Sequence, residues 1–217
     1  MEIIISDEIK KLTPNFYVGV IECDVTIYEE VKIDELINNL EYKIQTSHQI
    51  EEIVNLPIIK DGRDAYKTYG KDPSRYRLAT ESLYRRLVKG NRLYRINNVV
   101  DLGNILSIET RKSIAVLDAE KIKGNITIRL GNENDEYYGI GRGEINIANI
   151  PLYEDEIGPF GSVTSDTERT MISTHTSKVL IFIISFSGKS NLNSEIDFAM
   201  NLYRKFAKAT NFHTRIL

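Results

Sequence analysis

The order of helix-like and strand-like patterns constrains this 217-residue chain more than any single motif does. Between residues 34 and 108 apolar side chains recur mainly at helical spacing, whereas from residue 114 to 187 short apolar runs alternate with turn residues. Because the two patterns do not alternate regularly, they predict an α+β fold rather than a doubly wound parallel sheet. The strands predicted in the second half are Ile114–Leu117, Gly124–Leu130, Tyr137–Ile140, Glu144–Ile147 and Val179–Ser187. Glycines punctuate them at Gly131, Gly139, Gly141, Gly143, Gly158 and Gly161.

The flanking segments complete the mixed order. Ile3–Ser6 and Phe16–Ile27 are typical of strands, and a short helix capped by Ser6 or Asp7 lies between them. Four longer helices are predicted: one capped by Asp34, Pro73–Lys89 with Asp72 as N-cap and Gly90 as its end, Asn98–Ile108, and a last helix capped by Ser194. No linker or repeat interrupts the pattern, so we expect residues 1–217 to form one domain.

Composition narrows the functional classes. The single cysteine, Cys23, excludes an intrachain disulfide and a multi-cysteine zinc site, and the three histidines show no metal-ligand spacing. The longest apolar run, Val179–Ile184, is far shorter than the ~20 residues that span a bilayer. The N-terminus lacks the basic and apolar regions of a signal peptide. We therefore expect a soluble, cytoplasmic protein with no membrane partner, no metal and no cofactor.

Charge is distributed unevenly. Residues 60–95 hold 11 basic and 4 acidic side chains, whereas residues 133–168 hold 9 acidic side chains and one basic one. On the predicted helix Pro73–Lys89, four cations fall within an arc of about 100° that could meet RNA phosphates: Arg75, Arg85, Arg86 and Lys89. Tyrosines interleave with these bases and could stack on unpaired bases: Tyr66, Tyr69, Tyr84 and Tyr94. The alternative is a solvated helix face that the acidic segments neutralise.

A polar loop between residues 158 and 170 is the second candidate site. Its glycines let the backbone approach a ligand, and its hydroxyl and charged groups suit a small polar molecule. Within it Asp166 could hold an ammonium group and Arg169 a carboxylate or phosphate. The residues expected to border a pocket are Gly161, Ser162, Thr164, Ser165, Asp166 and Arg169, with Asn98 and Asp101 in support from the preceding helix. The alternative is a surface turn with a local Asp166–Arg169 ion pair.

Known catalytic motifs are absent. Ser162 lacks the Gly-x-Ser-x-Gly pattern of a nucleophile, and the glycines around Arg142 do not precede a helix as in a phosphate-binding loop. The sequence therefore assigns no catalytic residue.

Several stretches together resemble the B3/B4 domain of the bacterial phenylalanyl-tRNA synthetase beta chain. The resemblance covers about residues 60–190 and rests on Asn98–Asn104 and Ile114–Gly124, together with their order relative to the arginine-rich helix and the glycine-rich loop. Three other stretches look typical of stand-alone proteins built on this domain: Lys71–Arg77, Glu81–Arg86 and Gly158–Ser162.

The resemblance implies a three-layer α+β fold, with a β-sandwich of unusual topology flanked by helices. It also implies binding of tRNA or an aminoacyl-tRNA end and, in an enzymatic form, hydrolysis of a wrongly attached amino acid in trans. Two departures matter: Ala115 stands where the family's editing domain has a histidine, and Phe160-Gly161-Ser162 matches its glycine loop only loosely. Two alternatives therefore stay open, a non-catalytic protein that binds a free amino acid or similar metabolite and an RNA-binding module without pocket chemistry.

Overall fold

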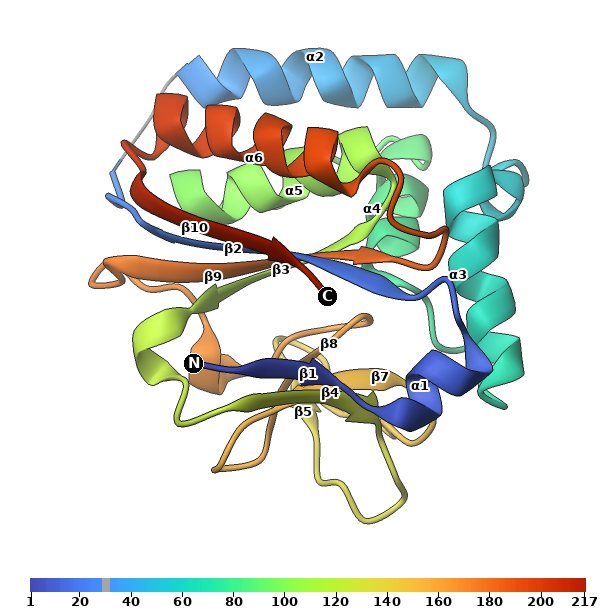
Figure 1. The fold of residues 1–217 in the computed structure, drawn as a ribbon. Coiled ribbons are helices and arrows are strands. Elements are labelled where there is room, and N and C mark those ends of the chain that lie inside the picture. The colour runs from blue at the N-terminus through green and yellow to red at the C-terminus, as the bar shows by residue number, and fades with distance from the viewer. Residues whose placement is uncertain (29–31) are drawn as a thin grey trace.

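The computed structural model describes residues 1–28 and 32–217 and has three layers (Figure 1). A layer of helices covers a four-stranded sheet, and this sheet faces a second four-stranded sheet on its other side. The predicted α+β sandwich flanked by helices is therefore confirmed. No helix among the described residues combines the length and hydropathy needed to cross a bilayer.

The upper sheet is antiparallel throughout. Its strands lie in the order β10 (Thr210–Ile216), β2 (Tyr17–Asp24), β9 (Lys178–Ser185) and β3 (Ser113–Asp118). The two central strands thus come from opposite ends of the chain, so the N-terminal segment is built into the same sheet as the strands after residue 110.

The lower sheet combines one parallel and two antiparallel pairs. Its order is β1 (Ile3–Ile5), β4 (Ile126–Leu130), β7 (Pro151–Glu154) and β8 (Pro159–Ser162), and only β1 pairs in parallel. Between β4 and β7 the chain forms a small hairpin of β5 (Tyr138–Gly139) and β6 (Gly143–Glu144). Residues of this hairpin line the candidate site.

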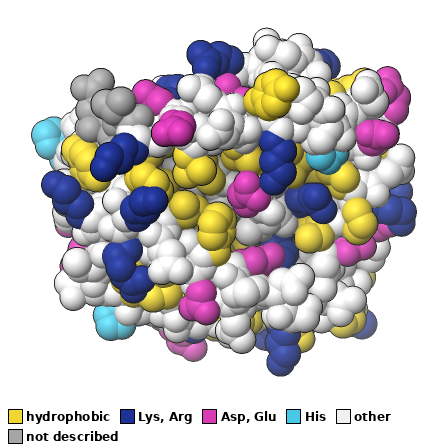
Figure 2. Space-filling model, turned by 90° about the horizontal axis from the view of Figure 1, so that it is seen from above, with side chains coloured by type: hydrophobic (Ala, Val, Ile, Leu, Met, Phe, Trp, Pro, Cys, Tyr) yellow, Lys and Arg dark blue, Asp and Glu magenta, His cyan; other side chains and the backbone are white. Residues whose placement is uncertain are grey.

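Helices cover the outer face of the upper sheet. In Figure 1, α2 (Lys32–Ser47) lies outermost, above α6 (Leu192–Phe206) and α5 (Asn98–Thr110), and α4 (Ala79–Val88) lies beside them. Two further helices stand at the side of the sandwich, α3 (Pro57–Thr68) and the short α1 (Asp7–Leu12). On the face above α2 and α6, basic, acidic and apolar side chains are interspersed, so charge is not segregated there (Figure 2).

The sequence of strand β9 is a continuous apolar run because both faces of the strand are buried. Successive side chains of a strand point to opposite faces. Leu180, Phe182 and Ile184 therefore join the core between the sheets, whereas Val179, Ile181 and Ile183 join the core beneath the helices. A strand buried on both faces has no polar face to present, which explains the uninterrupted hydrophobicity of residues 179–184.

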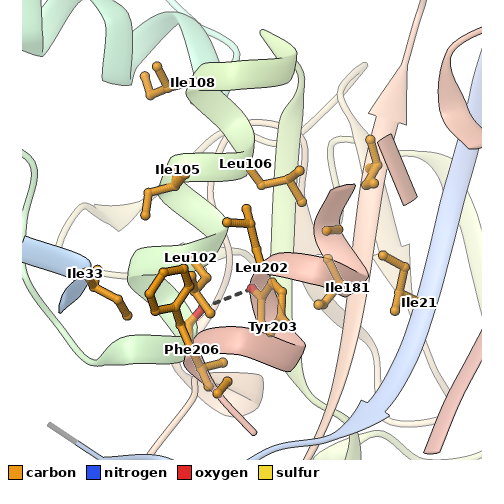
Figure 3. Close-up of a cluster of buried hydrophobic side chains, with 14 of the residues drawn as sticks. Ile21, Ile33, Leu102, Ile105, Leu106, Ile108, Ile181, Leu202, Tyr203 and Phe206 are labelled. Carbon is orange, nitrogen blue, oxygen red and sulfur yellow. Dashed lines mark hydrogen bonds between the residues drawn. The ribbon is translucent and has the colours of Figure 1, made fainter. Parts of the chain in front are cut away.

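The core beneath the helices joins elements that are distant in sequence. Figure 3 shows Leu102 and Ile105 of α5 and Phe206 of α6 packed together, with Ile21 and Ile181 of the sheet alongside. The one polar group among them is satisfied, because the hydroxyl of Tyr203 donates to the carbonyl of Val99 at 2.9 Å. The α5 face therefore contributes to stability rather than to a site.

Some element boundaries differ from the prediction. The helix expected to begin at Pro73 begins at Ala79, because Asp72 Oδ1 accepts hydrogen bonds from the amide and hydroxyl of Ser74 and holds a turn there. Asp34 lies inside α2, and α6 begins at Leu192, before the predicted cap at Ser194. The predicted strands at 137–140 and 144–147 shrink to the two-residue strands of the hairpin. One helix and three strands were not predicted at all: α3, β7, β8 and β10.

Candidate functional site

The polar loop after β8 turns back on itself rather than facing solvent. The Oγ atom of Ser162 accepts hydrogen bonds from the amides of Thr164 at 3.3 Å and Ser165 at 3.1 Å. The same hydroxyl donates to the carbonyl of Ser165 at 2.7 Å. These bonds close a tight turn and leave the Ser162 hydroxyl fully engaged within the loop.

The turn is packed against buried tyrosines. The hydroxyl of Tyr66, from α3, lies 2.7 Å from Thr164 Oγ1, and the hydroxyl of Tyr137 donates to the carbonyl of Ser165. Burial, reinforced by the charge of nearby Asp166, raises the pKa of Tyr137 far above its ordinary value. The Tyr137 hydroxyl therefore acts as a neutral hydrogen-bond donor that holds the loop.

Asp166 occupies the least satisfied position of the loop. Its Oδ1 atom is buried and has no hydrogen-bond partner among the described residues, although the residue as a whole keeps part of its surface exposed. Burial raises the pKa of Asp166 to about 7, and the backbone amide of Ser162 opposes this shift. A Cβ added at Gly161 would lie 2.7 Å from Asp166 Oδ1, so the carboxyl group packs directly on the glycine backbone. Near neutral pH much of this carboxyl is protonated, which weakens it as a partner for an ammonium group.

Arg169 does not pair with Asp166. Its guanidinium forms a bidentate ion pair with Asp155 at 2.8 and 3.0 Å and also donates to the carbonyls of Gly158 and Lys121. The alternative of a local Asp166–Arg169 pair is therefore wrong. Because four N–H groups of the guanidinium are engaged, Arg169 braces the loop instead of presenting a free cation.

The β5–β6 hairpin is fastened to this loop. The amide of Ile140 donates to the carbonyl of Asp166 at 2.9 Å, and Gly139 forms an isolated bridge with Thr167. A Cβ at Gly139 would lie 2.9 Å from Ser165 Oγ, so glycine permits this close approach. The hairpin and the loop thus form one continuous wall.

An open cavity of about 890 Å³ lies along this wall. Of the six loop residues expected to border a pocket, only Arg169 lines this cavity. The loop contributes its two ends instead, at residues 158–159 and 167–169, and the hairpin contributes glycines and Tyr138. The ends of the loop thus border this cavity, whereas the other five residues expected at a pocket do not line it.

The charge of the cavity is negative. Asp135 is engaged in a bidentate ion pair with Arg129, both N–O distances being 2.8 Å. Glu136 and Glu168 line the cavity, and their carboxylates have no ion-pair or hydrogen-bond partner in the part of the chain that the structure describes. The one cation of the lining is Arg169, which is already paired, so the cavity offers two free carboxylates and no free cation.

Asn98 and Asp101 belong to a different region. The amide of Asn98 donates to the carbonyls of Thr26 at 2.9 Å and Phe206 at 3.0 Å, which ties α5 to the end of α6. Asp101 accepts hydrogen bonds from Arg95 at 2.8 Å and from the amide of Ile96 at 3.0 Å. Both residues sit in the helical layer and do not support the loop, so their expected role is wrong.

A second hollow, the basic groove, lies at the solvent-exposed side of α4. It has a volume of about 300 Å³ and is lined by Arg77, Ser82, Arg85, Arg86, Lys89, Asn91 and Arg142. Three of the four cations predicted for RNA binding lie in it, but Arg75 does not. Arg75 points into solvent, with 82% of its side chain exposed, next to Asp72.

Most of the tyrosines predicted to stack on bases are buried. Tyr66, Tyr69 and Tyr84 are at most 5% exposed and pack in the cores. Tyr94 is 61% exposed, and the guanidinium of Arg86 lies 3.7 Å from the centre of its ring. The three buried tyrosines are therefore not available to stack on RNA bases, and only Tyr94 of the predicted set is exposed.

Neither the position of the family's histidine nor a metal cluster offers a catalytic group among the described residues. Ala115 is 2% exposed and lies on β3 in the core between the sheets, so the family's histidine position has no polar group here. Within residues 1–28 and 32–217, no three His, Cys, Asp or Glu side chains gather closely enough to hold a metal ion.

Sequence reasoning missed most of the lining, including five charged residues: Asp135, Glu136 and Glu168 in the cavity, and Arg77 and Arg142 in the basic groove. One signal was present: Arg142 is the single base among nine acids between residues 133 and 168, and glycines flank it. The side chain at the tip of a glycine turn projects away from its own hairpin. A lone cation there can therefore contact a different element.

Comparison with known proteins places the chain in a family. Among solved structures, it is similar to an N-terminal fragment of the phenylalanyl-tRNA synthetase beta-subunit from Pyrococcus horikoshii, with 12% sequence identity and a TM-score of 0.47. The match covers 99% of this chain and 50% of that fragment, so the chain spans about half of the fragment's length. No protein with a curated description matches the chain. The family model of the B3/4 domain matches residues 61–211, which include the loop, the hairpin and the basic groove, and the chain therefore belongs to the B3/4 domain family.

Proposed function

We propose that this chain, acting as one B3/4-type domain over residues 1–217, recognises the aminoacylated end of a tRNA in the open cavity. The observation that carries the proposal is the charge of that cavity. Glu136 and Glu168 are free carboxylates, whereas Arg169, the only lining cation, is paired with Asp155. Such a cavity favours a ligand with an ammonium group and no carboxylate, and an amino acid esterified to RNA has this form.

The same observation argues against the second candidate, a protein that binds a free amino acid. A free amino acid would bring its own carboxylate towards Glu136 and Glu168 without a free cation to receive it. Like charges within a few ångströms repel each other. We therefore expect an amino acid ester to bind more tightly than the corresponding free acid.

The rest of the RNA is a polyanion and needs cations. The basic groove supplies Arg85 and Arg86 on α4 and Lys89, the residue that follows the helix. Phosphate contacts by such side chains provide affinity without sequence specificity. In this proposal the groove contributes affinity and the cavity contributes selectivity for the aminoacyl group.

Hydrolysis of the ester would be the enzymatic form of this function. The hydroxyl of Ser162 is engaged inside the loop and that of Thr164 is engaged by Tyr66, so neither is free to position water. A general base must lie within reach of the attacking water. Glu136 and Glu168 are the free carboxylates of the cavity, so deacylation, where it occurs, should depend on one of them.

The test uses amino acid methyl esters and their free acids, followed by a panel of mischarged tRNAs. Calorimetry should show tighter binding of an ester than of its acid, and Glu136→Gln combined with Glu168→Gln should weaken ester binding about tenfold. Glu133→Gln is the matched control, because Glu133 is exposed in the same segment but does not line the cavity. Deacylation of the mischarged tRNAs then separates an enzyme from a binding protein. Equal affinity for esters and free acids would overturn the proposal.

A further inference from the structure

The basic groove gathers cations from three separate segments. Arg77 comes from the turn before α4, three cations come from α4 and the residue that follows it, and Arg142 comes from the tip of the β5–β6 hairpin. No carboxylate lines the groove among the described residues. The approach of the β5–β6 hairpin to α4 therefore brings together five positive side chains that the sequence separates by up to 65 positions.

Among the described residues, two of the five cations of the groove are unpaired, and two others share one distant carboxylate. The buried carboxylate of Glu81 pairs chiefly with Arg63 at 2.8 Å and lies farther from Arg77, at 3.8 Å, and from Arg85, at 4.0 Å. Lys89 and Arg142 have no side-chain partner in the described parts of the chain. Concentrating like charges destabilises a fold, and a bound anion relieves this repulsion.

The hairpin connects the groove to the open cavity. Gly139, Gly141 and Gly143 line the cavity, whereas Arg142, between two of these glycines, lines the groove. The two hollows therefore border the same narrow turn. Tyr138, which is 59% exposed, stands on the cavity side of the same hairpin.

We infer that the basic groove binds consecutive phosphates of a single RNA strand, whose 3′ end crosses the β5–β6 hairpin and enters the open cavity. This inference rests on the proposed function, since the cavity receives the aminoacyl group at that end. Arg142 is the cation nearest the crossing, and Arg77 and Lys89 extend the contact along the strand. Tyr138 offers a face on which the last base stacks, as exposed aromatic side chains do for unpaired bases.

A single strand fits the hollows better than a duplex does. The groove has a volume of about 300 Å³, and the path to the cavity passes over one two-residue-strand hairpin. A duplex presents both of its strands and a stacked interior, whereas only a single-stranded end can bend over such a turn. Guanidinium and ammonium groups supply phosphate contacts without reading the bases.

The experiment measures binding of a fluorescent single-stranded hexanucleotide that ends in CCA, at several salt concentrations. Charge reversal of Arg142 suits this test, because its turn is set by the positive φ angles of Gly141 (64°) and Gly143 (71°) and its side chain has no described partner. Arg142→Glu and Lys89→Glu should each weaken binding about tenfold and reduce the salt slope by about 0.7 for each lost phosphate contact. Two controls change the net charge equally outside the groove, Arg75→Glu beside it and Lys205→Glu on α6, and both should bind within about twofold of wild type.

A second probe separates the groove from the cavity. A hydrolysis-resistant aminoacyl-adenosine, in which an amide replaces the ester, carries no phosphate and can occupy only the cavity. Arg142→Glu should leave its affinity within about twofold of wild type, whereas Tyr138→Ala should weaken both probes. If the cavity does not bind the aminoacyl group, Arg142→Glu still weakens binding of the hexanucleotide. In that case neither wild type nor the variant binds an aminoacylated end more tightly than a free one.

Three results would overturn the inference. The first is a hexanucleotide affinity that is unchanged in both Arg142→Glu and Lys89→Glu. The second is tighter binding of inorganic pyrophosphate than of the hexanucleotide, which would make the groove a site for small anions. The third is an equal loss for both probes in Arg142→Glu, which would place Arg142 in the cavity.

Discussion

Replacing Asp166 with asparagine should stabilise the protein at alkaline pH. The Oδ1 atom of Asp166 is buried without a partner, and burial raises the pKa of this carboxyl from 3.8 to about 7. The folded state therefore favours the protonated acid, whereas the unfolded chain ionises near pH 4. The stability that depends on the protonated form is complete below pH 4 and is lost as the pH rises through 7.

The pKa change sets the magnitude. One pKa unit corresponds to about 1.4 kcal/mol, so a rise from 3.8 to about 7 gives an upper limit of about 4 kcal/mol lost between pH 4 and pH 8. Because part of the Asp166 residue remains exposed, we expect about half of this limit, or about 2 kcal/mol. Asparagine keeps the size of the side chain and carries no charge at either pH.

Urea denaturation of wild type and Asp166→Asn at pH 4 and pH 8 measures how the free energy of unfolding of each protein changes with pH. The variant should be more stable than wild type at pH 8 and should show the weaker pH dependence. Asp155→Asn is a control of opposite sign: burial alone would raise the pKa of Asp155, but Arg169 and the amides of Lys123 and Ile157 hold it below its ordinary value. That variant should lose stability at pH 8, and the loss should shrink as the pH falls. An Asp166→Asn protein that is less stable than wild type at pH 8, with unchanged pH dependence, would show that folded Asp166 is ionised and paired.

Two further substitutions test the packing beneath the candidate site. Glu81→Gln removes the buried carboxylate shared by three arginines and should lower the free energy of unfolding by about 3 kcal/mol in urea titrations, whereas Asp64→Asn, in an exposed ion pair, should change it little. Gly161→Ala would place a Cβ 2.7 Å from Asp166 Oδ1 and 2.8 Å from a ring carbon of Tyr153, so thermal denaturation should show a loss of about 1–3 kcal/mol. A Gly161→Ala protein with wild-type stability would show that the loop relaxes freely and that its turn is not rigid.

The sequence determined the class of fold and the location of the polar loop. Hydrophobic patterning depends on neighbouring residues, so the apolar run at residues 179–184 identified a strand before any contact was known, whereas its central place in the sheet came from the structure. The glycines and hydroxyls after residue 158 likewise marked a tight turn, and Ser162 closes that turn through bonds to residues two and three positions away. Hydrogen bonds between residues this close in sequence can be predicted from the residue types alone.

The helix boundary before α4 shows where local signals compete. Asp72 followed by Pro73 is a strong helix start, yet Asp72 uses its carboxylate to bind Ser74 and the helix begins at Ala79. The amide of Ala79 donates to the carbonyl of Val163, so the polar loop itself takes part in positioning this helix. An aspartate that caps a helix and one that closes a turn use the same atoms, and only the packing around them selects between the two.

Tertiary structure alone decided which side of the polar loop faces the cavity. Thr164 and Asp166 were candidates because their chemistry suits a ligand, but Tyr66 and the backbone of Gly161 hold them inside. Arg169 pairs with Asp155 rather than with nearby Asp166 because β8 folds back along β7. Arg142 reached α4 because the hairpin is fastened to the loop at Asp166 and Thr167. Each of these contacts joins residues from different elements, and its energy depends on how two sheets and a helix pack, which the spacing of residues along one segment does not encode.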